Sequence, residues 1–110
     1  MNKAVTCAES YLNAIKAGDL KTADTFYSNM YNDTESKEKR MEKMQKLMDG
    51  MGKIESFTLT DSVKKKSGDD RIIELTYKVK HTRLATIEKY TIMKDEGNYK
   101  IVSQMVENDK

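Results

Sequence analysis

The alternation of apolar and polar residues over residues 87–106 constrains the fold more than any other feature of the chain. Apolar side chains recur at every second position on both sides of a polar turn, which is the pattern of half-buried β-strands. Gly97 supplies the positive φ that a tight hairpin turn needs. With Glu96 and Gly97 at the centre of the turn, Ile92 pairs with Ile101 and both apolar side chains share one face. The segment is therefore predicted to be an antiparallel β-hairpin.

The two faces of this hairpin are expected to have different neighbours. The face predicted to lie beneath the rest of the chain consists of Tyr90, Ile92, Ile101 and Ser103. The opposite face carries Ile87, Met93, Val102 and Val106. That is more apolar surface than a solvent-facing sheet needs, so we expect something to cover it.

Two further strands are predicted upstream of the hairpin. Residues 73–79 alternate most clearly, and residues 53–63 alternate less strongly. A turn centred on residues 82–83 places Leu75 opposite Tyr90, which gives an apolar pair on one face. These strands and the hairpin together predict a four-stranded antiparallel sheet.

The same register makes two further predictions about the sheet. It places Ile73 opposite Ile92, again as an apolar pair. Ile87 is out of phase with Ile92, which predicts a β-bulge near residues 88–89. The polar residues 64–70 are predicted to form a loop.

The first half of the chain is predicted to form three helices. Residues 4–15 follow helical spacing and end before Gly18, which suits a helix C-terminus. Asp19 is expected to cap a second helix that runs from residue 20 to about residue 28. Residues 35–49 are predicted to form the third.

The third predicted helix has Asp33 or Thr34 as its expected N-terminal cap and an apolar stripe along one side. The stripe consists of Met41, Met44, Leu47, Met48 and Met51. A stripe at three- and four-residue steps most often faces a core. Because thioether side chains adapt their shape, the same stripe would also suit the lid of a ligand site.

Helices followed by strands predict an α+β domain, with three helices packed on one face of the sheet. The length of 110 residues suits a single domain, predicted to span residues 1–110. The 20 basic and 18 acidic residues nearly cancel, which disfavours nucleic acid as a partner. No apolar run reaches the length of a membrane-spanning helix.

The compartment stays open at this stage. The single cysteine, Cys7, precludes an internal disulfide and fits any compartment. The first ten residues lack the apolar core of a signal peptide. We expect an extracytoplasmic or lipid-anchored protein if a leader has been removed, and a cytoplasmic one otherwise.

Two stretches resemble the nuclear transport factor 2-like (NTF2-like), or cystatin-like, superfamily. The sequence AESYLNAIKAGDLKTADTFYS, residues 8–28, is similar to the opening of bacterial domains of this kind, including the pair Gly18 and Asp19 after the first helix. The sequence DEGNYKIVSQ, residues 95–104, resembles their closing strand, with Tyr99 where tryptophan is usual. The chain is most similar to short bacterial members of unassigned function, which are often lipoproteins.

This resemblance implies a strongly curved sheet that wraps into a cone, with the helices closing it around a pocket. It also implies frequent dimerisation through the outer face of the sheet. The residues then expected at a homodimer interface are Ile72, Ile87, Met93 and Val102. The superfamily contains isomerases, hydrolases and dehydratases as well as non-enzymatic binders, and no catalytic residue can be transferred to this chain.

A mixed apolar and tyrosine-lined pocket is the site that the sequence predicts. The expected lining residues are Tyr11, Tyr27, Met44, Met48, Tyr77, Glu88 and Tyr90. A buried tyrosine hydroxyl needs a partner, although packing alone would also explain these tyrosines. Glu88 shares a strand face with Tyr90; burial would raise its pKa, but a position on the rim is expected.

No catalytic set, metal site or cofactor is predicted. His81, the only histidine, is interpreted as a solvated turn residue, because no partner for a base or metal ligand is identifiable. Cys7 is interpreted as buried and inert. One histidine and one cysteine cannot assemble a zinc site. The aspartates Asp61, Asp69 and Asp70 do not have the spacing of a calcium loop.

The lysine run at residues 64–66 has two interpretations. It could contact phosphate or anionic lipid, since three cations lie side by side. The nearby Asp69 and Asp70 offset its charge, so a solvated loop is favoured.

Three functions fit these observations. The first is a non-enzymatic homodimeric binding domain that holds an apolar or amphipathic small molecule or a partner segment. The alternative is an isomerase or hydratase with Glu88 or Asp61 as base and a tyrosine as oxyanion donor. The third is a purely structural dimer in a cell-envelope assembly, formed through the sheet.

Overall fold

The computed structural model describes residues 3–29, 35–68, 70–95 and 97–109, and in this part of the chain the predicted order of helices and strands is confirmed. The helices are α1 (Lys3–Lys16), α2 (Leu20–Asp24) and α4 (Lys37–Met51). The strands are β1 (Ile54–Ser67), β2 (Asp70–His81), β3 (Ala85–Asp95) and β4 (Asn98–Asn108). The fold is an α+β cone of the expected class.

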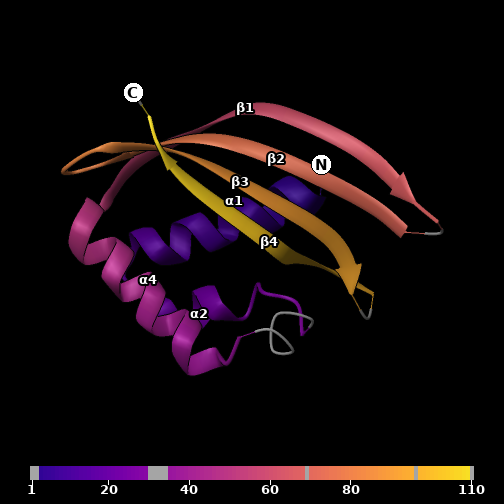
Figure 1. The fold of residues 1–110 in the computed structure, drawn as a ribbon, viewed down its shortest axis with the longest axis horizontal. Coiled ribbons are helices and arrows are strands. Elements are labelled where there is room, and N and C mark those ends of the chain that lie inside the picture. Colours follow the sequence, from indigo (N-terminus) through magenta and orange to yellow (C-terminus); the bar gives the residue numbers. More distant parts are fainter. Residues whose placement is uncertain (1–2, 30–34, 69, 96, 110) are drawn as a thin grey trace.

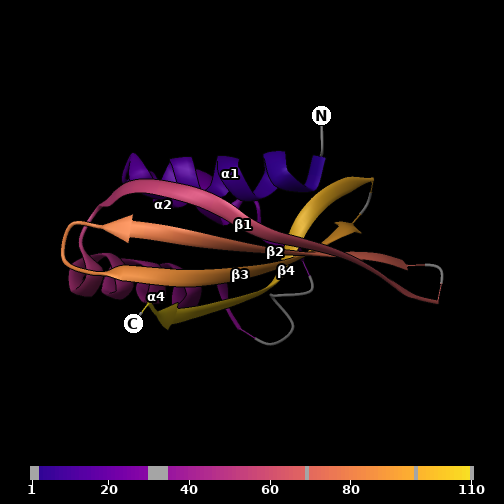
Figure 2. The same ribbon diagram turned by 90° about the horizontal axis from the view of Figure 1, so that it is seen from above.

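The four strands form one antiparallel meander in the order β1-β2-β3-β4. The sheet curves over α1, and α2 and α4 lie on the same side, so the helices cover one face of the sheet (Figure 1). Seen from above, the β1–β2 hairpin extends past the end of the helices (Figure 2). The sheet therefore has an inner face, which the helices cover, and an outer face, which they do not cover.

The predicted strand registers are confirmed. Ile92 pairs with Ile101 across the last hairpin, and Leu75 pairs with Tyr90 across the preceding one. All four side chains are fully buried. These inner-face pairs meet Leu12 of α1, also fully buried, and so form the centre of the core.

Local signals in the sequence explain where the helices begin and end. Gly18 adopts a φ of 76°, which allows the amide of Asp19 to bond the carbonyl of Ala14 and close α1. Asp19 caps α2 as predicted, accepting from the backbone amide of Thr22 at 3.1 Å. Ser36 caps α4; the caps expected at residues 33–34 lie outside the described residues.

The second helix is shorter than predicted, because the chain after it pairs with the sheet. α2 ends at Asp24, and the amide of Ser28 then donates to the carbonyl of Ile101 at 2.8 Å. The amide of Ile101 donates in turn to the carbonyl of Phe26, also at 2.8 Å. These two bonds tie the end of the helical segment to β4.

The predicted loop at residues 64–70 was wrong, because β1 continues to Ser67 and pairs with β2 up to the turn at Gly68. The predicted bulge at residues 88–89 was also wrong. The pairing of β2 with β3 is continuous there, and Thr86 and Glu88 share the inner face with Tyr90.

The irregularity along β3 lies instead in its pairing with β4; the pairing of β1 with β2 also has register shifts, between Ile54 and Ser56 and between Leu59 and Asp61. Thr91 pairs with Ser103 and Ile92 with Ile101, so Val102 is the extra residue of a bulge. This bulge turns Ser103 to the solvent, where it is exposed, and contradicts its predicted inner position. It also brings Gln104 opposite Tyr90 and Val106 opposite Glu88, onto the inner face, so the predicted outer position of Val106 was wrong.

Candidate functional site

A cluster of polar side chains lies on the inner face of the sheet, where β2 ends and β3 begins. His81 is the last residue of β2, and Thr86, Glu88 and Tyr90 follow at every second position of β3. All four side chains are buried, with Glu88 only 4% exposed. The register of the β2–β3 hairpin therefore concentrates polar groups in one part of the core.

The carboxylate of Glu88 is the centre of this cluster. Its Oε1 atom accepts a hydrogen bond of 2.5 Å from the Tyr90 hydroxyl. Its Oε2 atom accepts one of 2.6 Å from the Thr86 hydroxyl and lies 3.2 Å from Nε2 of His81. Both oxygens are therefore held by side chains of the same hairpin.

The two ring nitrogens of His81 have different neighbours. Nδ1 lies 3.2 Å from the carbonyl oxygen of Gly52, which can only accept. Nε2 faces the Glu88 carboxylate and the Thr86 oxygen, whose proton is already donated to Glu88. Both ring nitrogens therefore face oxygen atoms, and Nε2 lies 3.2 Å from the buried Glu88 carboxylate.

The pKa values follow from these contacts. Burial by itself would raise the pKa of Glu88, but the hydrogen bonds from His81, Thr86 and Tyr90 outweigh burial and lower it. Burial, together with the adjacent Glu88 charge, raises the pKa of Tyr90 well above its usual value. Glu88 is thus an anion and Tyr90 a neutral donor near neutral pH.

A second hydrogen-bonded group adjoins the first. The hydroxyl of Tyr27 lies 3.0 Å from that of Tyr11 and donates to Oε1 of Gln104 at 2.5 Å. Nε2 of Gln104 donates to the Tyr11 hydroxyl at 3.2 Å. The ring of Tyr11 meets that of Tyr90 edge-on, with 5.6 Å between centroids, so the two groups are in contact.

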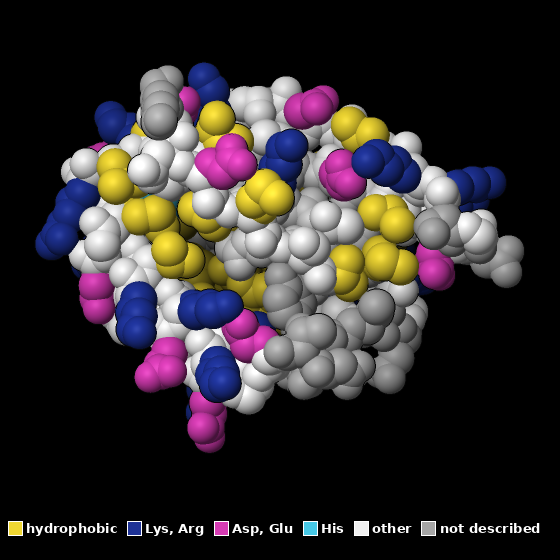
Figure 3. Space-filling view, in the orientation of Figure 1, with side chains coloured by type: hydrophobic (Ala, Val, Ile, Leu, Met, Phe, Trp, Pro, Cys, Tyr) yellow, Lys and Arg dark blue, Asp and Glu magenta, His cyan; other side chains and the backbone are white. Residues whose placement is uncertain are grey.

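A narrow slot leads from the surface to these polar groups. Its lining residues are Tyr11, Leu12, Ile15, Met44, Leu47, Met48, Met51, Ile54, His81, Glu88 and Gln104. Figure 3 shows hydrophobic side chains gathered around a hollow between α4 and β4. The slot has a volume of about 30 Å³, which is room for a water molecule or two.

The structure brings most of the predicted lining residues together. Four of them line the slot itself: Tyr11, Met44, Met48 and Glu88. Tyr27 and Tyr90 lie directly behind them through the contacts given above. Tyr77 stacks edge-on against Tyr90 at 6.1 Å, but its hydroxyl donates to Glu9 of α1, at 3.1 Å, and burial is the main cause that raises its pKa.

Two sequence-based interpretations are corrected here. His81 is a buried, hydrogen-bonded residue and does not lie in solvent. Glu88 is buried and does not lie on the rim of the site. The other candidate carboxylate, Asp61, is exposed on β1 and lines no part of the slot.

Thr86 and Gln104 are the members of the site that sequence analysis missed. Thr86 had a detectable signal, because the confirmed register with β2 places it on the same face as Tyr90. Gln104 had none, since its inward position depends on the bulge at Val102.

Cys7 is buried, as expected, and desolvation raises the pKa of its thiol to about 11. Within the described residues, no three His, Cys, Asp or Glu side chains gather into a possible metal site. The helices of the described chain all fall short of the length and hydropathy that crossing a bilayer requires.

The outer face of the sheet carries the residues predicted for a dimer interface. Ile72 pairs with Met93 across β2 and β3, and Ile87 lies further along β3 on the same face. All three, and Val102 on β4, are half-buried. The helices lie on the opposite side of the sheet (Figures 1 and 2).

Comparison with known families yields one match across almost the whole chain. The sequence profile of the NTF2-like N-terminal transpeptidase domain matches residues 3–107. No curated protein matches the sequence at a significant level.

Several solved structures share the fold. A cystatin-like protein of unknown function from Nostoc punctiforme aligns with a TM-score of 0.73 at 10% identity, over 97% of this chain and 89% of its own. An NTF2-like protein from Streptomyces avermitilis, provisionally described as a dehydratase, aligns with a TM-score of 0.67 at 11% identity, over 97% of this chain and 94% of its own. An NTF2-like protein from Cytophaga hutchinsonii aligns with a TM-score of 0.66 at 14% identity, over 99% of this chain and 100% of its own. These identities establish the fold alone.

Proposed function

Because the chain belongs to the family of NTF2-like N-terminal transpeptidase domains, we propose that it is a non-enzymatic binding domain that acts as a homodimer. The family name refers to a domain at the N-terminal side of transpeptidases. The role proposed for this chain is to bind an apolar or amphipathic small molecule or a partner segment. A fold does not define a function, so the proposal rests on the interior and on the outer face of the sheet.

The state of Glu88 is the single observation that favours binding over catalysis. A general base needs a free lone pair directed at its substrate and a pKa near the working pH. Both oxygens of Glu88 are occupied by three donors, and its pKa is lowered. The slot above it, at about 30 Å³, has room for a water molecule or two but not for a substrate. These features argue against the isomerase or hydratase alternative.

The outer face of the sheet is the proposed homodimer surface. Ile72 and Met93 form a cross-strand apolar pair at one end, and Ile87 continues the apolar strip along β3. A two-fold axis across this face would bring the strip against its own copy, as isologous interfaces require. Antiparallel sheets with one uncovered apolar face are stabilised when that face is buried.

Sedimentation velocity tests this surface. The wild-type protein is expected to sediment as a dimer at micromolar concentration, and Met93→Lys as a monomer, because a buried unpaired charge opposes association. Leu47→Lys is the matched control, since Leu47 is 38% exposed on α4, on the side of the sheet opposite the proposed interface. A monomeric wild-type protein, or a dimeric Met93→Lys variant, would contradict the proposed interface.

An apolar ligand in the slot is a second candidate, favoured by the methionines at its mouth. Met44, Met48 and Met51 lie along one side of α4 and line the slot. Their unbranched side chains can change rotamer and widen the entrance. Tyr11 and Gln104 at the base would then offer hydrogen-bonding groups to the polar end of an amphipathic molecule.

Thermal unfolding in the presence of fatty acids of eight to twelve carbons tests this candidate. Saturating ligand is expected to raise Tm by about 3 °C or more in the wild type, as binding to the native state does. Met48→Trp should fill the slot and abolish the shift, whereas Met105→Trp, on the exposed part of β4, should retain it. Equal shifts in both variants would place binding elsewhere.

A further inference from the structure

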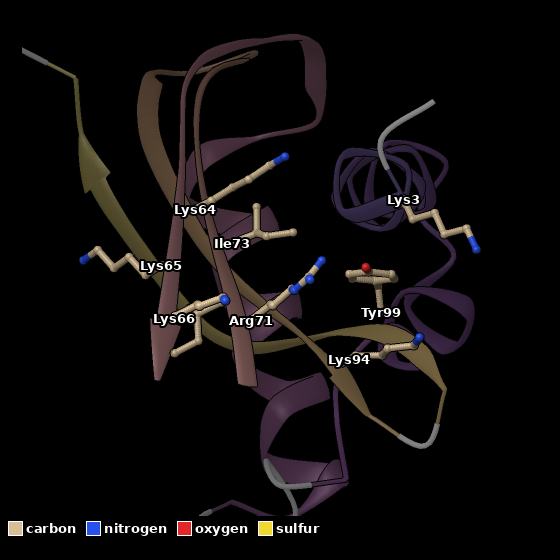
Figure 4. Close-up of a pocket in the computed structure, with 9 residues that line it drawn as sticks. Lys3, Lys64, Lys65, Lys66, Arg71, Ile73, Lys94 and Tyr99 are labelled. Atoms are coloured by element: carbon tan, nitrogen blue, oxygen red, sulfur yellow. The ribbon is translucent and has the colours of Figure 1, made fainter. Parts of the chain in front are cut away.

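A basic groove lies at the far end of the sheet from the slot. It has a volume of about 650 Å³ and is formed by the β1–β2 hairpin, the β3–β4 hairpin and the start of α1. Its cationic lining residues are Lys3, Lys64, Lys65, Lys66, Arg71 and Lys94. Ile73 and Tyr99 supply an apolar and aromatic wall (Figure 4).

The register of the first hairpin directs part of this charge inward. Lys64 pairs with Ile73 and Lys66 pairs with Arg71, so these cations occupy inner-face positions. Further along β2, the inner-face residues are apolar and buried. At this end of the hairpin, cations occupy the inner-face positions instead. Figure 4 shows Lys64 and Arg71 pointing across the groove toward α1 and Tyr99, whereas Lys65 points away.

The placement of these cations lowers the stability of the folded protein when no ligand is bound. Lys66 and Arg71 are directly opposite one another, and like charges in that position destabilise a sheet. Local features that work against stability are typical of functional sites, where a ligand compensates for them. A bound anion would attract both side chains and so offset the repulsion between them.

The charge of the groove is not neutralised by its described lining. No carboxylate is among the described lining residues, although Asp70 lies beside the groove in an adjoining hollow. Glu74 pairs with Lys65 at 3.1 Å, on the outer face, which leaves the inward cations to the groove. The whole chain has a net charge of only +2, so this concentration is local.

We propose that this groove binds a small phosphate ester that carries two or more phosphate groups. Lys64, Lys66 and Arg71 bind the phosphates from the sheet, and Lys3 and Lys94 bind them from the opposite side. Arginine and lysine are the side chains that recognise phosphate, Arg by paired donors and Lys as a point charge. Tyr99 offers a flat surface to the organic part of the ester.

Isothermal titration calorimetry with inorganic pyrophosphate and with inositol hexakisphosphate tests the proposal. The double variant Lys64→Gln/Arg71→Gln is expected to weaken the binding of both probes about tenfold or more, since two charge-assisted contacts are lost. Lys78→Gln/Lys80→Gln removes the same charge from exposed positions of β2 outside the groove, and should change affinity less than about threefold. Circular dichroism confirms that both variants are folded.

Two further measurements locate the site and separate its possible ligands. Amide chemical shifts of Ile73 and Tyr99 should move with pyrophosphate in the wild type, because both line the groove. The second measurement is co-sedimentation of the protein with vesicles of phosphatidylglycerol and phosphatidylcholine. Soluble phosphate esters should displace any protein that binds the vesicles. The proposal is overturned by absence of probe binding, by equal weakening in both double variants, or by binding to vesicles alone.

Discussion

The hydroxyl of Tyr90 donates a 2.5 Å hydrogen bond to the carboxylate of Glu88, two residues earlier on the same strand. Because alternate residues of a strand share a face, this bond forms within β3, and the sheet register sets its surroundings. His81 and Thr86 complete the environment of Glu88 from the same hairpin. The interior of the cone therefore contains a charged group whose three hydrogen-bond partners all belong to one hairpin.

Replacing Glu88 tests how much this buried anion stabilises the fold. Glu88→Gln leaves His81 without its charged partner and should lower the free energy of unfolding by about 3 kcal/mol near neutral pH. Urea denaturation measures the loss. Glu74→Gln is the control, because Glu74 is 38% exposed and pairs with Lys65 outside the core, where such pairs contribute about 0.5 kcal/mol.

The pH dependence of the same variant gives an independent check. The folded-state pKa of Glu88 lies below its ordinary value of 4.5, so protonation favours unfolding. The stability that this carboxylate contributes is present above that value and is lost as the pH falls through the folded-state pKa. The difference in unfolding free energy between wild type and Glu88→Gln should therefore shrink as the pH falls below 4.5. Parallel profiles would show that Glu88 does not have the lowered pKa.

Gly52 should be the least replaceable glycine among those described. Its φ is 86°, and an added Cβ would lie 1.8 Å from the Thr82 side-chain oxygen and 3.3 Å from the amide nitrogen of Arg83. Gly52→Ala is expected to cost about 2 kcal/mol or more and to disturb the carbonyl that His81 binds. Gly50→Ala is the matched control: it lies within α4, has open space around it, and should raise stability by about 0.5 to 1 kcal/mol. Equal Tm values for the two variants would contradict this account.

The ion pair between Arg40 and Asp24 should be important for holding α4 against α2. The two side chains are each 6% exposed, and Nε of Arg40 lies 3.0 Å from the Asp24 carboxylate. Arg40→Met leaves a buried carboxylate with one fewer partner and should cost about 3 kcal/mol in chemical denaturation. Lys37 pairs with the same Asp24 at 3.8 Å but is 57% exposed, so Lys37→Met should cost less than about 0.5 kcal/mol. A similar loss in both would rule out burial as the cause.

Apolar pairing explains why the sheet could be predicted from the sequence. Leu75 with Tyr90 and Ile92 with Ile101 are strong same-face pairs on either side of identifiable turns, so only one register satisfies them. The helix boundaries at Gly18 and Asp19 were predictable for a similar reason, because each residue type has one preferred position at a helix end.

The candidate site was harder to predict, because it violates the pattern that reveals the fold. Thr86 and Glu88 occupy inner-face positions. Polar residues at these positions make the apolar alternation look shifted by one residue, which led to the wrong prediction of a bulge at residues 88–89. Ile101 and Val102 are adjacent and both apolar, so either of them could point to the inner face. The bulge at Val102 therefore has no signal in the sequence. Burial of His81 depends on contacts with Gly52 across the chain, which local patterns do not encode.

Lysine side chains concealed the length of the first hairpin in the same way. Residues 64–66 have neither apolar alternation nor β-branched residues, although they pair fully with β2. Their strand conformation follows from the partner strand, whose apolar pattern is strong. The resulting cross-strand pairing of Lys66 with Arg71 therefore lowers stability, and the sheet tolerates it.

Removal of that pairing of like charges should make the protein more stable. Lys66→Thr abolishes the repulsion from Arg71 across the strands and introduces a residue favoured in strands, so the free energy of unfolding should rise by about 0.5 to 1 kcal/mol. Lys65→Thr makes the same change at the neighbouring outer-face position but breaks the pair with Glu74, so its gain should be smaller. Because salt screens exposed charges, the difference between the two variants should diminish as salt is raised toward about 1 M. Equal gains at every salt concentration would assign the effect to strand propensity, and repulsion between Lys66 and Arg71 would then have no part in it.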